Sequence, residues 1–161
     1  MIYVDISTLS DGLHEIVLNP TAESLDLDPE TFSSIETSVR LDIGDRQILC
    51  RIDAKADAVL ICDRTLEPFT ESVGGEFTVL FTEDPGEIVA DDDTIVLLDP
   101  SARSLDITEM VRDTLLLSIP LRKVAPAARD AELQLEFGGP ADDAGAIDPR
   151  WEALRKLKTG S

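Results

Sequence analysis

The side chains best suited to metal or nucleophilic chemistry in this sequence are two cysteines and one histidine. Cys50 and Cys62 lie twelve residues apart, and His14 lies far from both in the segment GLHEIVL. A tetrahedral zinc site needs about four ligands, and no Cys-x-x-Cys or paired histidine supplies them. Twelve residues of straight strand span roughly 40 Å, whereas a disulfide needs Cα atoms about 6 Å apart. We therefore interpret Cys62 as a buried apolar thiol, and we predict no metal site.

Few residues of this sequence could form a catalytic site. Any Ser-His-Asp or Cys-His arrangement would have to use His14, which we interpret as a half-exposed strand residue. Gly74-Gly75 matches neither common phosphate-binding motif. The run DDD at 91–93 could bind a divalent cation, but a chain with 33 acidic residues contains such clusters by coincidence. We predict a non-catalytic protein without a cofactor, and a divalent-metal enzyme remains the weakest alternative.

A long period-two pattern predicts the strand that ends at Cys62. The even-numbered positions from Ile48 onward are apolar or small, and charged residues stand between many of them. Alternation sustained over fifteen residues is typical of a strand with one buried face. We predict a strand over residues 46–62 whose even-numbered side chains enter the core.

The run before this strand predicts its hairpin partner. Residues 34–43 show the same alternation, and Gly44-Asp45 separates the two runs. A glycine at the first central position suits a type II′ two-residue turn. That turn fixes an antiparallel register in which Val39 pairs with Cys50, and a slip by one residue would put apolar against polar side chains.

Further strands are predicted on the other side of Cys62. Residues 73–81 alternate again and predict an antiparallel return, with DRTLEPF at 63–69 as the connection. Residues 94–100 predict another strand after an acidic loop at 83–93. Consecutive hairpins of this length make a mostly antiparallel, strongly twisted sheet, which could close in part into a barrel.

Two helices are predicted after the strands. Asp106 and Glu109 have the spacing of a capping box, so we expect one packed helix at about 106–119, ended by Pro120. The segment DPRWEALRKLK predicts a short C-terminal helix, and GGPADDAGA before it is flexible by composition. The chain is therefore predicted to be an α+β domain at 1–137, a flexible linker at 138–147, and a C-terminal helix and tail at 148–161.

Charge is distributed unevenly along the chain. The net charge is −19, and the first 100 residues hold 23 acidic but only 5 basic residues. An anionic surface disfavours general nucleic-acid binding and suits either a basic protein partner or a salt-rich cytosol. No apolar run is long enough to span a membrane, and the first residues lack a secretory signal. We expect a soluble cytoplasmic protein.

The order of these features resembles the YceD family of bacteria and plastids. Members show a strand that ends in Cys-x-Arg-Cys-Leu-Glu-Pro-Phe. This sequence has Cys62, Arg64 and the run LEPF at 66–69, with Thr65 where the second cysteine would be. Members then carry a segment close to LDITEMVRDTLLLSIPL and end near DPRWEALRKLK. The resemblance covers most of residues 40–158 in order and spacing.

The resemblance implies a role in making the large ribosomal subunit, because the family is associated with accumulation of its ribosomal RNA. Family genes often neighbour the gene for a small zinc-ribbon protein of that subunit. The implied partners are the pre-ribosomal large subunit, its RNA or a basic ribosomal protein, and an acidic holding partner for such a protein is the alternative function. Many members carry a second cysteine group that suggests zinc. Its absence here, together with Thr65, argues against zinc.

Candidate contacts with RNA or a protein partner come from the few basic segments. Arg64 could pair with Glu67 or bind a partner, while Leu66 and Phe69 could plug one end of the core. Arginine planes and an aromatic ring suit phosphate contact and base stacking, although the same charges could neutralise the acidic half. The candidate contact residues are Arg64, Arg122, Lys123, Arg150, Trp151, Arg155, Lys156 and Lys158.

Overall fold

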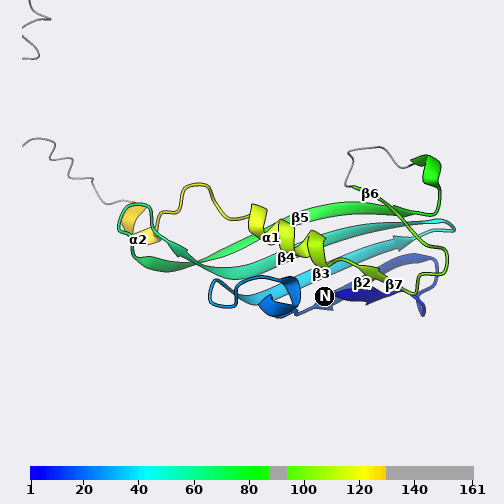
Figure 1. The fold of residues 1–161 in the computed structure, drawn as a ribbon, viewed down its shortest axis with the longest axis horizontal. Coiled ribbons are helices and arrows are strands. Elements are labelled where there is room, and N and C mark those ends of the chain that lie inside the picture. The colour runs from blue at the N-terminus through cyan, green and yellow to red at the C-terminus, as the bar shows by residue number, and fades with distance from the viewer. Residues whose placement is uncertain (88–93, 130–161) are drawn as a thin grey trace, which may run out of the picture. The chain divides into compact units, whose positions relative to one another are not determined.

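The protein is described by a computed structural model of residues 1–87 and 94–129 (Figure 1). A mixed five-stranded sheet has the order β2-β3-β4-β5-β6, and two short strands, β1 and β7, form a second sheet. The predicted α+β class with a mostly antiparallel, twisted sheet is confirmed. The strands are β1 (Tyr3–Asp5), β2 (Gly12–Leu18), β3 (Phe32–Ile43), β4 (Gln47–Ile61), β5 (Pro68–Thr82), β6 (Ile95–Leu97) and β7 (Ser104–Asp106). The helices are the 3-10 turns η1 (Ala22–Leu25) and η2 (Pro85–Glu87), α1 (Thr108–Leu117) and the short α2 (Pro126–Arg129).

The buried face of β4 follows the alternation in the sequence. Even-numbered residues from Ile48 to Leu60 are buried, and the residues between them are exposed or half-buried. The antiparallel ladder with β5 runs without a register shift from Gln47↔Thr82 to Ile61↔Pro68. The predicted face of this strand is therefore confirmed.

The predicted register of the β3–β4 hairpin is wrong by two residues. Val39 pairs with Ile52 and not with Cys50. A displacement of two residues keeps the same side chains in the core, so the period-two pattern is equally compatible with both registers. The observed register also places Glu36 opposite Lys55, which is a favourable cross-strand pair.

The displacement arises in the turn. The Gly44 N–H donates to the Gln47 carbonyl oxygen at 2.9 Å, so Asp45 and Arg46 are the central residues. A type II′ turn needs a positive φ at its first central residue, and none of the turn residues has one. The turn therefore lies one residue later than predicted, and this moves every cross-strand pair by two positions.

The edge of β5 that faces away from β4 pairs with a shorter strand, β6. β6 lies within the predicted segment 94–100 but pairs parallel to β5, and only at Leu80–Thr82. β5 begins at Pro68, so the last two residues of the predicted connection belong to the strand. The rest of the β5 edge has no neighbouring strand among the described residues.

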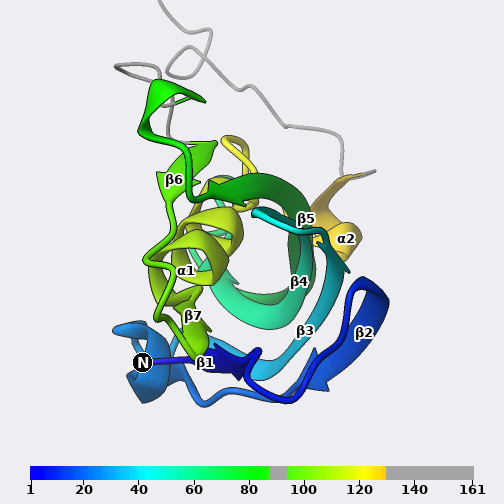
Figure 2. The same ribbon diagram turned by 90° about the vertical axis from the view of Figure 1, so that its right-hand side faces the viewer.

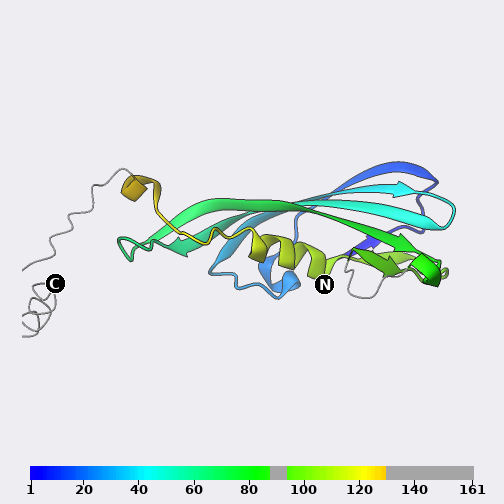
Figure 3. The ribbon, with the colours of Figure 1, turned by 90° about the horizontal axis from the view of Figure 1, so that it is seen from above.

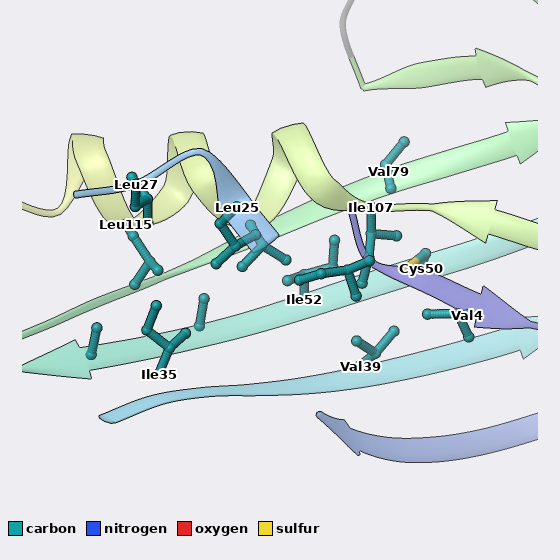
Figure 4. Packing of buried hydrophobic residues seen from close by; sticks show 14 of the residues in the cluster. Val4, Leu25, Leu27, Ile35, Val39, Cys50, Ile52, Val79, Ile107 and Leu115 are labelled. Carbon is teal, nitrogen blue, oxygen red and sulfur yellow. The ribbon is translucent and has the colours of Figure 1, made fainter. Parts of the chain in front are cut away.

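The sheet curls around α1 (Figure 2). β2 and β6 share no ladder, so the sheet is not a closed barrel. α1 lies along β4 and β5 on the concave side (Figure 3). A Cβ at Gly75 would lie 3.1 Å from Cγ2 of Thr114, so the glycine permits this close approach. Figure 4 shows the core between these layers, whose fully buried members include Leu25, Val39, Ile52, Ile107 and Leu115.

The start of α1 differs from the predicted helix at about 106–119. Asp106 ends β7, and its carboxylate accepts hydrogen bonds from the Thr108 N–H at 3.0 Å and the Thr108 hydroxyl at 2.5 Å. The helix begins at Thr108 with Ile107 as its cap residue, and no side-chain bond at that cap is present. Asp106 therefore ties the strand to the helix without the reciprocal bond of a capping box.

The predicted linker at 138–147 and the C-terminal helix and tail at 148–161 lie outside the described residues. The same holds for five candidate contacts, Arg150, Trp151, Arg155, Lys156 and Lys158. The linker, the C-terminal helix and these five contacts stay predictions. Within the described part of the chain, no helix is long and apolar enough to cross a membrane.

Candidate partner-binding site

The family-like motif forms the loop that closes the β4–β5 hairpin. The Cys62 N–H donates to the Glu67 carbonyl oxygen at 2.9 Å, and the Leu66 N–H donates to the Cys62 carbonyl oxygen at 2.9 Å. Leu66 has a φ of +60°, a left-handed conformation that costs roughly 1–2 kcal/mol for a residue with a side chain. Leu66 is 77% exposed, so the prediction that it plugs the core is wrong. Phe69 is partly buried and packs as predicted.

Cys62 is the first residue of this loop and is fully buried. It packs against Val124 and Ala128 in a small cluster separate from the main core. The Thr65 side chain hydrogen-bonds to the thiol, and the Ala125 N–H donates to Sγ at 3.4 Å. These hydrogen bonds favour the thiolate and therefore lower the pKa of Cys62 from 9.0 to about 7. The bond from the Thr65 side chain makes the largest contribution. The predicted burial is confirmed, and the thiol also accepts hydrogen bonds.

The loop holds the segment that follows α1. The Asp63 N–H donates to the Lys123 carbonyl oxygen, and the Lys123 N–H donates to Oδ2 of Asp63, both at 2.7 Å. Nη1 of Arg64 donates to the Ala128 carbonyl oxygen at 2.7 Å. We call this arrangement of residues 62–69 and 121–129 the tip latch.

The tip latch brings three of the predicted contact residues together. Arg64 lies in the loop, and Arg122 and Lys123 lie in the segment that the loop holds. Arg122 is exposed and Lys123 is half-buried. Arg129 ends the segment and pairs with Glu71 of β5 at 2.9 Å. The Arg64 guanidinium thus acts within the chain as a latch, although it bonds to a backbone oxygen and not to Glu67 as the sequence suggested.

The residues considered for metal or nucleophilic chemistry lie apart. Cys50 is buried in the main core, where desolvation raises its pKa to about 12. His14 lies on β2, and its Nε2 is 2.7 Å from the Ser10 carbonyl oxygen. Both cysteines are free thiols. Within residues 1–87 and 94–129, no three histidine, cysteine, aspartate or glutamate side chains gather as potential metal ligands.

A groove that no sequence pattern predicts lies between α1 and the edge of β5. It has a volume of about 870 Å³ and runs past Gly74–Phe77 of β5 and Ile95–Leu97 of β6. Met110 and Leu117 of α1 contribute apolar surface on the other side. Each ionisable residue that lines it is acidic, and these are Glu76, Glu109 and Asp113. Because the groove depends on where α1 packs, no local pattern in the sequence reveals it.

Comparison with known proteins gives two matches. A family model described as "Large ribosomal RNA subunit accumulation protein YceD" matches residues 50–158. The chain is also similar to the uncharacterized protein YlbN of Bacillus subtilis (strain 168), with 27% identity over 143 residues. That similarity covers 83% of this chain and 79% of YlbN. No solved structure matches the chain.

Proposed function

Because this chain belongs to the YceD family, we propose that it is a non-catalytic, cytoplasmic factor in the accumulation of large-subunit ribosomal RNA. The observation that carries the proposal is the match of the family model over residues 50–158, which include most of β4 and all of β5, α1 and the tip latch. The factor acts by binding a component of the assembling large subunit.

The tip latch supports a binding role. Its motif residues serve the architecture: Cys62 is packed, Arg64 bonds to a backbone oxygen, and Asp63 holds Lys123. The same arrangement presents exposed side chains at the end of the hairpin, including Leu66, Leu121 and Arg122. Cationic and apolar groups on a fixed backbone suit contact with RNA or with a ribosomal particle.

Co-sedimentation with large-subunit precursors tests the proposal. Association of the wild-type protein should weaken as salt rises and should disappear after ribonuclease treatment, because phosphate binding depends on counterion release. Neutralising Arg122 and Lys123 to glutamine should reduce association, and so should neutralising Arg150, Arg155, Lys156 and Lys158 together. For every phosphate that a variant no longer binds, the salt slope should fall by about 1.

A matched control uses cations on the outer face of the sheet. Arg40 and Arg51 lie opposite each other on β3 and β4, and both are exposed. Replacing this pair with glutamine removes the same charge as the Arg122 and Lys123 variant and should leave association unchanged. If the wild-type protein does not co-sediment with large-subunit precursors, the proposed function is wrong.

A second candidate function is an acidic holding partner for a basic ribosomal protein. The excess of acidic residues in the first 100 positions favours it, and so does the acidic lining of the groove beside α1. This function requires a stable binary complex with a basic protein of the large subunit in the absence of RNA. Affinity purification at native salt, with and without ribonuclease, separates the two candidates.

A further inference from the structure

Among the described residues, one edge of β5 has no neighbouring strand over most of its length. β5 spans fifteen residues, and β6 pairs with only the last three. The Leu80 N–H donates to the Thr94 carbonyl oxygen at 2.8 Å, so the backbone of Leu80 faces away from β4. In an antiparallel ladder every second residue faces the same way. The outward-facing row is therefore Thr70, Ser72, Gly74, Glu76 and Thr78, and no described residue hydrogen-bonds to its backbone groups on that side.

The open edge borders the groove beside α1. Residues Gly74–Phe77 contribute the edge itself, and α1 forms the opposite wall. In an added strand, alternate side chains would enter the groove against apolar surface from Phe77, Met110 and Leu117. The remaining side chains would point to the outer face, where Glu76 is exposed. The groove volume of about 870 Å³ leaves room for a short extended segment.

The charge at the groove indicates the chemistry of the occupant. Glu76, Glu109 and Asp113 line it, and Arg112 beside them pairs with Asp113 at 3.0 Å. Three carboxylates and one guanidinium leave these four side chains with a net negative charge. A second copy of this acidic chain would bring like charges together at the same edge, whereas a segment rich in lysine or arginine would be attracted.

We propose that the β5 edge between Thr70 and Thr78 binds an extended basic segment of a partner protein by adding it to the sheet as a strand. Backbone hydrogen bonds to the outward row provide affinity, and the apolar groove and acidic residues select alternating apolar and basic side chains. The inference rests on the second candidate function, because the β5 edge would be the surface by which an acidic holding partner binds a basic protein.

The test uses the full chain and a synthetic nonapeptide of alternating lysine and valine with both ends blocked. Fluorescence anisotropy of the labelled peptide should show saturable binding to the wild-type protein. An otherwise identical peptide with glutamate in place of lysine should bind at least tenfold more weakly. A lysine–valine peptide methylated on every backbone nitrogen cannot donate to the edge in either strand direction and should also lose at least tenfold.

Variants of the edge provide a second arm. Thr78→Pro removes an outward N–H that makes no bond to β4, so the fold should persist while peptide affinity falls at least tenfold. Thr78→Val keeps that N–H and should bind within about twofold of the wild type. The double variant Glu76→Lys and Glu109→Lys should lose at least tenfold, and its matched control, Asp11→Lys with Glu30→Lys at exposed loop positions, should lose less than twofold.

Each result is decisive for the proposal. Absence of saturable binding to the wild type, or equal affinity for the methylated peptide, overturns the β5-edge site whether or not Thr78→Pro folds. Formation of a binary complex with a basic large-subunit protein in the absence of RNA is measured in parallel. If the wild type forms that complex but the peptide does not bind, the edge site fails while the second candidate function stands. If the peptide binds but no such complex forms, the second candidate function fails and the edge site stands.

Discussion

The two thiols of this chain differ because their surroundings differ. Thr65 and neighbouring N–H groups hydrogen-bond to Cys62 and lower its pKa to about 7. Desolvation in the main core raises the pKa of Cys50 to about 12. The folded state thus favours the thiolate at Cys62 and the thiol at Cys50, and folding stability depends on pH with opposite signs at the two sites.

The first prediction concerns this pH dependence. The folded pKa of Cys62 lies below its unfolded value, so its ionisation stabilises the fold fully above about pH 9 and this contribution is lost as pH falls through about 7. Cys62→Ser should therefore lose more stability relative to the wild type at pH 9 than at pH 6, where only a modest packing loss is expected. Urea denaturation at the two pH values measures the difference.

Cys50→Ser is the matched control. Because the folded pKa of Cys50 is raised, its contribution is present below about pH 9 and is lost only as pH rises from there toward 12. The stability difference between Cys50→Ser and the wild type should thus stay constant between pH 6 and 8. A loss for Cys62→Ser that is the same at pH 6 and pH 9 would contradict the assigned hydrogen bonding.

The second prediction concerns zinc. The resemblance to the YceD motif implies a cysteine where this chain has Thr65, and the Thr65 side chain hydrogen-bonds to the Cys62 thiol. The described residues offer no group of three potential ligands. We expect protein purified without chelators to contain no stoichiometric zinc by elemental analysis. One zinc per chain would mean that ligands outside the described residues complete a site.

At the level of elements, β4 is the central strand of the five-stranded sheet. It pairs along its full length with β5 and along most of its length with β3, and its inward row forms the floor beneath α1. Ile52 lies at the middle of that row and is fully buried (Figure 4). A charge at this position would have no partner in the surrounding apolar cluster.

The third prediction tests the face assignment of β4. Ile52→Asp should destabilise the protein by about 3–5 kcal/mol, because it buries an unpaired charge and removes apolar packing. Thermal and urea unfolding measure the change. Arg51→Asp, one residue away on the exposed face opposite Arg40, should change stability by less than about 0.5 kcal/mol. An unchanged melting temperature for Ile52→Asp would refute the assignment.

Elements with a long alternation of apolar and polar residues could be predicted from the sequence, and elements without such a pattern could not. The inward face of β4 and the return of β5 are encoded by alternation over many residues. The register of the β3–β4 hairpin depends on turn geometry, and a displacement of two residues leaves that alternation unchanged. β1 and β7 have three residues each, which is too few to show a period.

The candidate site was predictable only in part. The run from Cys62 to Phe69 shows the family-like motif in the sequence. A charged side chain in a connection between strands favours a latching role, and Arg64 has that role in the structure. The partners of the latch, Lys123 and Ala128, lie about sixty residues further along the chain. Contacts over such a separation depend on the path of the chain after α1, which no local pattern specifies.

For the whole molecule, the dominant feature is the excess of negative charge. Acidic residues outnumber basic residues by 33 to 14, so the folded chain carries like charges at close range. The ion pairs seen among the described residues involve few of these acids, and most of their side chains are partly or largely exposed. Self-repulsion of this kind destabilises a compact state and is screened by salt.

The fourth prediction follows from this repulsion. The melting temperature should rise as sodium chloride increases from about 0.05 M to 1 M, because the Debye length falls from beyond 10 Å to about 3 Å. Potassium chloride should act similarly, since screening depends on ionic strength. Scanning calorimetry measures the shift. A melting temperature that falls with salt would show that attractive ion pairs outweigh the repulsion.

The pairing of β1 with β7 has a consequence for synthesis. Val4 lies opposite Leu105, so the first strand leaves the ribosome long before its partner is made. The consecutive hairpins from β2 to β5 can form earlier, but their concave apolar face stays uncovered until α1 emerges. We expect ribosome-stalled chains to become protease-resistant only once α1 has cleared the exit tunnel. For most of its translation, the growing chain therefore exposes apolar surface of the kind that makes folding intermediates prone to aggregation.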